Sequence, residues 1–102
     1  MGAERFDEFG AGADAQKAFD AAHDKACYDY GHRGYTGSLA EKSSFEMRND
    51  GKPVLSTRAV NFADDDLEEN DHDTWGPAWA VAVYGDDPAI IIGYHFYGYA
   101  SS

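Results

Sequence analysis

Two apolar segments near the C-terminus, residues 79–84 and 89–99, flank the turn sequence Gly85-Asp86-Asp87-Pro88. Glycine, aspartate and proline favour tight turns, so the pattern predicts a β-hairpin. Alternation along the second segment places Ile90, Ile92, Tyr94 and Phe96 on one face and Ile91, His95, Tyr97 and Tyr99 on the other. Because both faces are largely apolar or aromatic, we expect a central strand with one face against a helix.

A helical pattern occupies residues 14–30. Its apolar residues recur at steps of three and four, which is the spacing of one face of an amphipathic helix: Ala15, Phe19, Ala22, Ala26 and Tyr30. Asp14 is a suitable N-cap, and Gly31 and Gly34 supply the open conformations that end a helix. Because most of this stripe is alanine, we expect the helix backbone to approach a sheet closely.

The remaining segments give weaker strand patterns. Residues 4–9 alternate loosely before a glycine-rich loop, which predicts a short edge strand. Residues 38–40 and 54–60 are further strand candidates, separated by the turn signal Asn49-Asp50-Gly51. Together these patterns predict an α+β fold. One main amphipathic helix, with a short second helical segment, packs on a small antiparallel sheet of about three to five strands that includes the C-terminal β-hairpin.

Length and composition favour a single folded domain over residues 1–102. A chain of this size, with 43% hydrophobic and 15% aromatic residues, can bury enough apolar surface to offset its chain entropy. Cys27 is the only cysteine, which excludes an intramolecular disulfide and is typical of a reducing compartment. The N-terminal residues lack the apolar stretch of a signal peptide, and no apolar run approaches the roughly 20 residues that span a bilayer. We therefore expect a cytoplasmic protein.

The charges are divided unevenly along the chain. All eight Lys and Arg residues lie at or before Arg58, whereas residues 59–102 carry nine carboxylates: Asp64, Asp65, Asp66, Glu68, Glu69, Asp71, Asp73, Asp86 and Asp87. Concentrated charge repels itself and destabilises a compact state, so it indicates either a solubility device or a surface for a strongly basic partner. The formal net charge of −11 opposes direct binding to nucleic-acid phosphates and to anionic membranes.

Seven of these carboxylates fall within residues 61–73, and their conformation decides their charge density. An extended run would space its charges by about 5 Å, and a helical run by about 2.3 Å. These values bracket the spacing of roughly 3.4 Å per charge along one nucleic-acid strand. A solvated loop is the alternative explanation for such a run, and adaptation to high salt is a variant of it. Halophilic charge, however, coats a whole surface rather than one segment.

No catalytic or metal-binding pattern is complete in the sequence. The acids from Asp64 onward are spaced as in a calcium loop, but Glu69 stands where that loop needs glycine. The glycines within residues 31–37 follow a helix, whereas phosphate-binding loops precede one. Cys27 has His23 four residues before it but no third group to orient the histidine. We therefore expect no enzymatic activity, no metal and no cofactor.

The segment from Ala15 to Lys42 resembles a pattern found in small proteins encoded by bacteriophages and other mobile elements. The matching parts are the Ala-rich helix running into Tyr30-Gly31, then Gly34-Tyr35-Thr36-Gly37 and Ala40-Glu41-Lys42, and later Trp75-Gly76-Pro77 with an aromatic C-terminal strand. Some small acidic phage proteins are anti-CRISPR or anti-restriction inhibitors that present carboxylates where host machinery expects phosphates. The resemblance implies such a role, but it assigns no contact residues.

The leading hypothesis is a non-enzymatic, anti-CRISPR-like inhibitor in the cytoplasm of a bacterial host cell. Its nine C-terminal carboxylates would bind the basic nucleic-acid-binding surface of a host protein or complex and block access of DNA or RNA. Seven tyrosines and two tryptophans would supply packed contacts. The alternative is a small phage accessory or virion-associated interaction module whose acidity serves solubility only. A metal-assisted hydrolase is a third hypothesis, and the oligomeric state is open.

Overall fold

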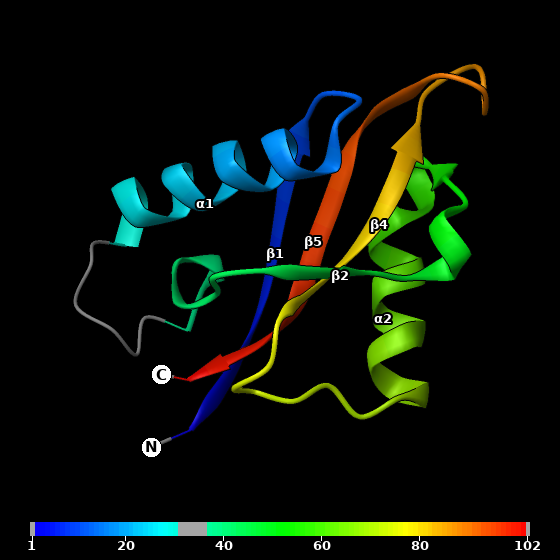
Figure 1. Cartoon of the computed structure of the whole chain (residues 1–102). Helices are drawn as coiled ribbons and strands as arrows, with labels where there is room; N and C mark the ends of the chain where they lie inside the picture. The colour runs from blue at the N-terminus through cyan, green and yellow to red at the C-terminus, as the bar shows by residue number, and fades with distance from the viewer. Residues whose placement is uncertain (1, 31–36, 102) are drawn as a thin grey trace.

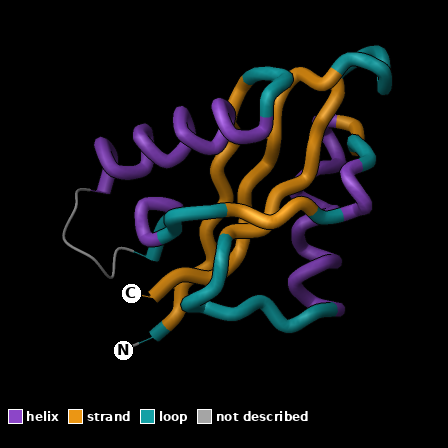
Figure 2. The backbone as a smooth tube through the Cα atoms, viewed as in Figure 1, coloured by secondary structure: helices purple, strands orange, loops and turns teal. Residues whose placement is uncertain are grey.

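The computed structural model describes residues 2–30 and 37–101, with the backbone alone at residue 30. These residues form a five-stranded sheet with a long helix on each face (Figures 1 and 2). In chain order the elements are β1 (Ala3–Ala11), α1 (Ala15–Tyr30), β2 (Phe45–Met47), β3 (Val54–Leu55), α2 (Ala59–Glu69), β4 (Ala78–Tyr84) and β5 (Ile91–Ser101). No helix among the described residues is long and apolar enough to cross a membrane.

The sheet has the strand order β1-β5-β4-β2, and β3 also pairs with β4. Strand β5 is central and pairs antiparallel with β1 on one side and β4 on the other, which confirms the predicted hairpin and edge strand. Strands β2 and β3, however, run parallel to β4, facing its first and second halves. The predicted α+β fold is confirmed, but the sheet is mixed and not antiparallel throughout. The segment between residues 45 and 55 joins the edge of β4 twice in the same direction.

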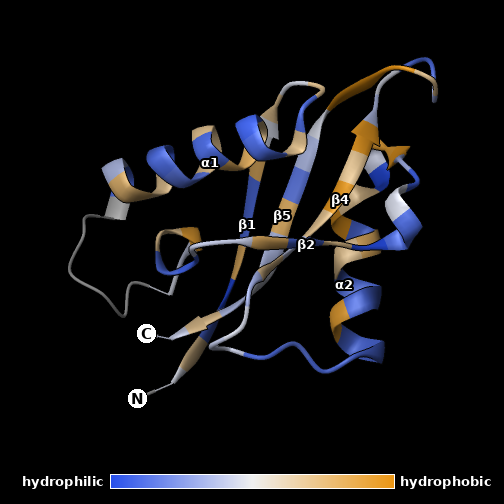
Figure 3. Ribbon diagram, viewed as in Figure 1, coloured by the Kyte–Doolittle hydropathy of each residue, from blue (hydrophilic) through white to orange (hydrophobic). Residues whose placement is uncertain are grey.

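Helix α1 confirms the helix predicted over residues 14–30. The backbone N–H of Lys17 donates to the Asp14 carboxylate at 3.0 Å, as expected of an N-cap. Polar and apolar residues alternate along α1 (Figure 3), and its buried side chains are Ala18, Phe19, Ala22 and Ala26. A Cβ at Gly10 would lie 2.2 Å from the Ala18 carbonyl oxygen, so glycine at this position lets the helix approach β1. Gly31 and Gly34, predicted to end the helix, lie outside the described residues.

Two core clusters lie on opposite faces of the sheet because successive residues of β4 point in opposite directions. On the α1 side, Phe19 packs against Phe45 and Phe96, with ring centroids 5.2 and 5.4 Å apart. On the α2 side, the buried residues are Ala63, Leu67, Trp79, Val81 and Tyr97. Both faces of β5 are therefore covered, whereas the sequence argument required a helix on only one.

Helix α2 begins at the end of a region where the sequence predicted a strand. The strand expected over residues 54–60 is only Val54–Leu55, and α2 begins at Ala59. The buried residues of α2 have helical spacing, but one of them is the carboxylate Asp66: Ala59, Ala63, Asp66 and Leu67. Because Asp66 is an acid at a buried position, the apolar stripe of α2 could not be recognised within the run of charged residues. The sequence predicted a short second helical segment without a position, and the structure has a helix of 11 residues here.

Three smaller predictions have different outcomes. Residues 38–40 are not a strand, because the Ser38 side chain accepts a 3.2 Å hydrogen bond from the Ala40 N–H and starts a single turn of 3₁₀ helix. The turn at residues 49–51 is confirmed. At an irregularity in the β4–β5 pairing, the partly buried Ile91 packs against the core on the α1 side, which contains Phe96. Ile91 therefore lies on the face opposite to the one that strict alternation predicts.

Candidate functional site

The acidic run of residues 61–73 is divided between α2 and the loop of residues 70–77 that leads to β4. Six of its seven carboxylates are exposed: Asp64, Asp65, Glu68, Glu69, Asp71 and Asp73. We call these six residues the acidic face. Four of them belong to α2. Over this helical part the charges therefore have the closer, helical spacing and not the wider spacing of an extended chain.

The four helical carboxylates of the acidic face destabilise the helix that carries them. Asp64 and Glu68, like Asp65 and Glu69, are four residues apart, which brings like charges within about 6 Å along the helix axis. They also cluster toward the C-terminal end of α2, where the helix dipole favours cations, and α2 has no basic residue in its last turn. Among the described residues, Arg5 is the only base that pairs with the acidic face, through Asp64.

Asp66, which the sequence groups with the partner-binding carboxylates, is instead buried beneath α2, with 9% of its surface exposed. Arg48 binds it in a bidentate manner, with Nε 2.9 Å from Oδ2 and Nη2 3.0 Å from Oδ1. The Tyr97 hydroxyl donates to Oδ2 at 2.6 Å, and Asn70 Nδ2 donates to Oδ1 at 2.9 Å. These bonds join α2 to β5 and to the segment after β2. Asp66 therefore stabilises the fold and is not part of the acidic face.

The Asp66 network has one stable protonation state at neutral pH. Burial alone would raise the pKa of the Asp66 carboxyl, but the hydrogen bonds from Arg48 and Tyr97 outweigh it and hold this pKa below its usual value. The hydrogen bond to Asp66 raises the pKa of Arg48. Burial, reinforced by the same carboxylate, raises the pKa of the Tyr97 hydroxyl. Arg48 also stacks on Trp79, with its guanidinium carbon 3.9 Å from the ring centroid.

A second polar chain links β1 to α2 and β5. Arg5 donates hydrogen bonds to Asp64 and, at 3.1 Å, to Asp7. Asp7 Oδ1 lies 2.8 Å from His95 Nε2. The His95 ring stacks on Tyr97 with centroids 5.8 Å apart. Through these contacts Arg5, Asp7 and His95 all have polar partners. Asp64, which pairs with Arg5, is held more firmly than the other residues of the acidic face.

The side chains of His72 and Lys42 fix the loop of residues 70–77. The Tyr99 N–H donates to His72 Nδ1 at 3.0 Å, so the ring proton lies on Nε2 and is donated to the Pro77 carbonyl at 2.8 Å. Burial lowers the pKa of His72, which suits this neutral form. Lys42 is 3% exposed, and its ammonium group donates to the carbonyls of Thr74 at 2.6 Å and Gly76 at 2.9 Å.

Asp86 and Asp87 lie apart from the acidic face. They form the β4–β5 turn, at the end of β4 opposite to the loop of residues 70–77 (Figure 1). Asp87 Oδ1 accepts a 2.9 Å hydrogen bond from the Ala89 N–H, which supports the turn itself. The nine carboxylates of the sequence prediction thus comprise six at the acidic face, two at this turn and one buried.

The described residues contain no group of three or more His, Cys, Asp or Glu side chains that could hold a metal ion. Both ring nitrogens of His72 already bond to backbone groups, so Asp71, His72 and Asp73 do not converge on one point. Cys27 Sγ lies 3.8 Å from His23 Nδ1. The centroid of the His23 ring lies 5.7 Å from that of the Phe19 ring.

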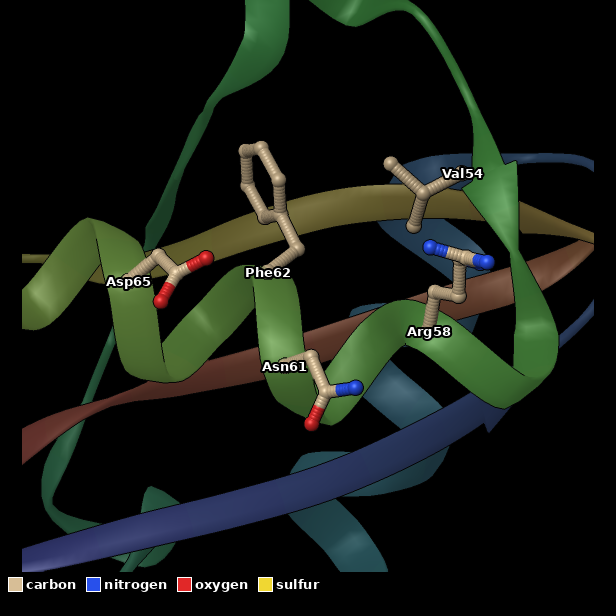
Figure 4. Close-up of a pocket in the computed structure, with 5 residues that line it drawn as sticks. All are labelled: Val54, Arg58, Asn61, Phe62 and Asp65. Atoms are coloured by element: carbon tan, nitrogen blue, oxygen red, sulfur yellow. The ribbon is translucent and has the colours of Figure 1, made fainter.

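A groove of about 240 Å³ runs beside the first turns of α2 (Figure 4). Val54 and Phe62 give it an apolar surface, and Phe62 lies between Arg58 and Asp65 along the helix. Small-molecule sites usually measure about 300–1,000 Å³, so this groove suits one side chain of a protein partner better than a free ligand. It borders the acidic face at Asp65.

Sequence reasoning missed the residues that organise this region: Lys42, Arg48, His72 and Tyr97. Each of them makes a hydrogen bond to a residue at least 18 positions away in the sequence. His72 also makes one local bond, to Pro77. Such contacts leave no periodic signal in a single sequence. The one local indication is Asn70 four residues after Asp66, a pairing that can close the end of a helix.

No protein family, curated protein or solved structure matches this chain significantly. Functional inference therefore rests on the residues and geometry described above.

Proposed function

We propose that the protein is a non-enzymatic inhibitor acting in the cytoplasm of a bacterial cell. Its acidic face binds the basic nucleic-acid-binding surface of a host protein or complex and blocks access of DNA or RNA. The observation that carries this proposal is the group of like charges near the C-terminal end of α2. They oppose one another and the helix dipole, so the chain retains them at a cost to its own stability.

Spacing and burial support binding by charge. Carboxylates four residues apart on α2 lie about 6 Å apart along the axis, and the loop residues Asp71 and Asp73 extend the same surface. A basic channel that accepts phosphates would attract this surface at long range, and salt would weaken the attraction. Compared with the sequence prediction, the proposed contact set omits the buried Asp66 and the distant Asp86 and Asp87.

The alternative, acidity that serves solubility only, makes a different prediction about position. For solubility, a charge on α1 is equivalent to a charge on α2. Helix α1 also carries exposed acids, which are interspersed with Lys17 and Lys25: Asp20, Asp24 and Asp29. This arrangement provides a control variant of matched charge.

The test compares two variants that each lose three negative charges. Asp65→Asn, Glu68→Gln and Glu69→Gln neutralise the acidic face, whereas Asp20→Asn, Asp24→Asn and Asp29→Asn neutralise α1. Each protein is immobilised and exposed to a bacterial lysate at low and high salt, and bound proteins are eluted with DNA or RNA. We expect the wild type and the α1 variant to retain a protein that nucleic acid and salt release, and the α2 variant not to retain it. Equal retention by both variants, or release by neither agent, contradicts the proposal.

A further inference from the structure

Strand β1 lies at one edge of the sheet. It extends over nine residues, Ala3–Ala11, and among the described residues it pairs with β5 alone (Figure 1). Strands usually have about five or six residues, so this edge is long. The odd-numbered residues of β1 are all exposed. A free edge presents a row of unpaired N–H and C=O groups, to which another extended chain can bind.

The hydrogen-bond pattern shows which backbone groups of β1 point away from β5. The Gly12 N–H donates to the Ile92 carbonyl at 2.9 Å, one step beyond the last pair of the β1–β5 register. Hydrogen-bonded and non-bonded pairs alternate along an antiparallel ladder, so the even-numbered residues of β1 bond to β5. Tyr99, the partner of Arg5, donates its N–H to His72 and not to β1, as this alternation requires. The N–H and C=O groups of the odd-numbered residues therefore point to the outer edge.

Two carboxylates lie along this edge on the face of β1 that is turned to α1. Glu4 and Glu8 alternate with Phe6, which is buried in the core on the α1 side. A hollow of about 170 Å³ lies between residues 4–8 and residues 37–39. The Glu8 side chain is only 14% exposed, and its ion pair with Lys25 Nζ is 3.9 Å long. Because an enclosed carboxylate is costly unless it is closely paired, a further base at this edge would stabilise Glu8.

The charges of β1 disfavour a second copy of the same strand as the occupant of this edge. Two β1 strands related by a twofold axis would pair antiparallel, and their outward-facing groups allow only registers that oppose residues of equal parity. Each of the five central registers brings like charges directly opposite each other: Glu4 with Glu4, Arg5 with Arg5, Glu4 with Glu8, Asp7 with Asp7, or Glu8 with Glu8. Such pairs destabilise a sheet, and the formal net charge of −11 adds to the repulsion.

We propose that the free edge of β1 binds an extended segment of another protein as an added strand, with a lysine or arginine opposite Phe6. The side chain of that base points to the α1 side and lies diagonally between Glu4 and Glu8, within reach of both. Backbone hydrogen bonds to the odd-numbered residues of β1 give affinity, and the two carboxylates select a basic strand. This inference does not depend on the acidic face, because Glu4 and Glu8 lie on the face of the sheet opposite to α2.

The test uses three heptapeptides titrated into the full chain. The first has lysine as its second, fourth and sixth residues, and threonine or valine between them, so that all three lysines share one face of the strand. The second has the same sequence and charge but is N-methylated at its third and fifth residues, which removes the N–H groups that would face the odd-numbered residues of β1. The third has glutamine in place of each lysine.

Two variants of the chain accompany the peptides. Glu4→Gln with Glu8→Gln removes the edge carboxylates, and Asp20→Asn with Asp24→Asn removes two exposed charges from α1 as a matched control. Calorimetry measures affinity, and amide hydrogen exchange followed by NMR reports which backbone groups of β1 become paired. Circular dichroism verifies that each variant is folded.

We expect the lysine peptide to bind the wild type and to slow amide exchange at Arg5, Asp7 and Phe9, whose N–H groups point outward. The amides of Phe6 and Glu8, which bond to β5, should already exchange slowly in the free protein. The N-methylated peptide should bind about tenfold or more weakly. Removing either the lysines or the two edge carboxylates should cost about fivefold or more in affinity, and the α1 control should stay within about twofold of the wild type.

Three results would overturn the proposal. Equal affinity of the lysine peptide and its N-methylated form would mean that charge alone attracts the peptide and that the edge does not pair. Equal affinity of the wild type and the edge variant for the lysine peptide would remove the role of the two carboxylates. Failure of the lysine peptide to bind, or protection of the outward amides by dimerisation of the chain without peptide, would exclude a basic strand as the occupant.

Discussion

The hydroxyl of Tyr97 on β5 donates a 2.6 Å hydrogen bond to Asp66 on α2, directly beneath the acidic face. The contact separates two roles within one run of acids. Asp66 holds the helix to the sheet, and its neighbours Asp65 and Glu68 are exposed. A neutralising substitution at Asp66 would therefore report on folding, while the same substitution at Asp65 reports on the surface.

The first prediction concerns this contact. Tyr97→Phe removes one donor to a buried, ionised carboxylate and should lower the free energy of unfolding by about 1.5–3 kcal/mol. Asp66→Asn should cost about 3 kcal/mol, because it leaves Arg48 without its charge partner. Asp65→Asn, one residue away, should stay within about 0.5 kcal/mol of the wild type. Urea denaturation measures all three, and equal stability of the Asp65 and Asp66 variants would show that the network contributes nothing.

The second prediction is a pH dependence that arises from His72. Burial lowers the pKa of His72 in the folded protein, whereas an unfolded histidine titrates near pH 6.5. Just below that pH the unfolded chain binds more protons than the folded chain. Stability should therefore be full above about pH 6.5 and fall as the pH decreases, by at most about 1.4 kcal/mol per pH unit for this one group.

His72→Gln provides the control for the pH dependence. An amide can donate to the Pro77 carbonyl and accept from the Tyr99 N–H, but it does not titrate. Between about pH 7.5 and about pH 5.5, the unfolding free energy of this variant should fall less steeply than that of the wild type. Parallel curves for the two proteins would assign the acid sensitivity to other groups.

The structure also shows which parts of this fold a single sequence can predict. The α1 stripe and the β4–β5 hairpin were predictable because their periodicity is local and continuous. Helix α2 was not, since the buried Asp66 interrupts its apolar stripe with a charge that only Arg48 and Tyr97, distant in sequence, can accommodate. The parallel pairing of β2 and β3 was equally hidden, because strands of two and three residues carry too little alternation to set a direction. The division of the predicted site into exposed and buried carboxylates was not predictable either, because a carboxylate that faces inward looks the same in sequence as one that faces water.

The third prediction concerns the alanine face of α1. Ala22 is 2% exposed and packs in the core between α1 and the sheet. Ala22→Leu should overpack this contact and destabilise the protein by about 1–3 kcal/mol. Ala21→Leu makes the same chemical change at an exposed position of the same helix and should alter stability by less than about 0.5 kcal/mol. Thermal melting of both variants tests the packing, and similar melting temperatures would contradict it.

The last prediction concerns the energetic cost of the acidic face. The triple variant Asp65→Asn, Glu68→Gln and Glu69→Gln removes both like-charge repulsions at four-residue spacing, between residues 65 and 69 and between residues 64 and 68. It also reduces the unfavourable interaction with the helix dipole. Its unfolding free energy should exceed that of the wild type by roughly 0.5–1.5 kcal/mol at low salt. Asp64 is kept because it pairs with Arg5.

Salt distinguishes this electrostatic gain from a gain in intrinsic helix propensity. The difference between the two proteins should shrink as the Debye length falls from about 10 Å at 0.1 M to about 3 Å at 1 M salt, because the wild type gains most from screening. A difference that persists at high salt would mean that the substitutions act through the backbone. No stabilisation at low salt would mean that the acidic face costs the fold nothing, and the main support for a retained binding surface would be lost.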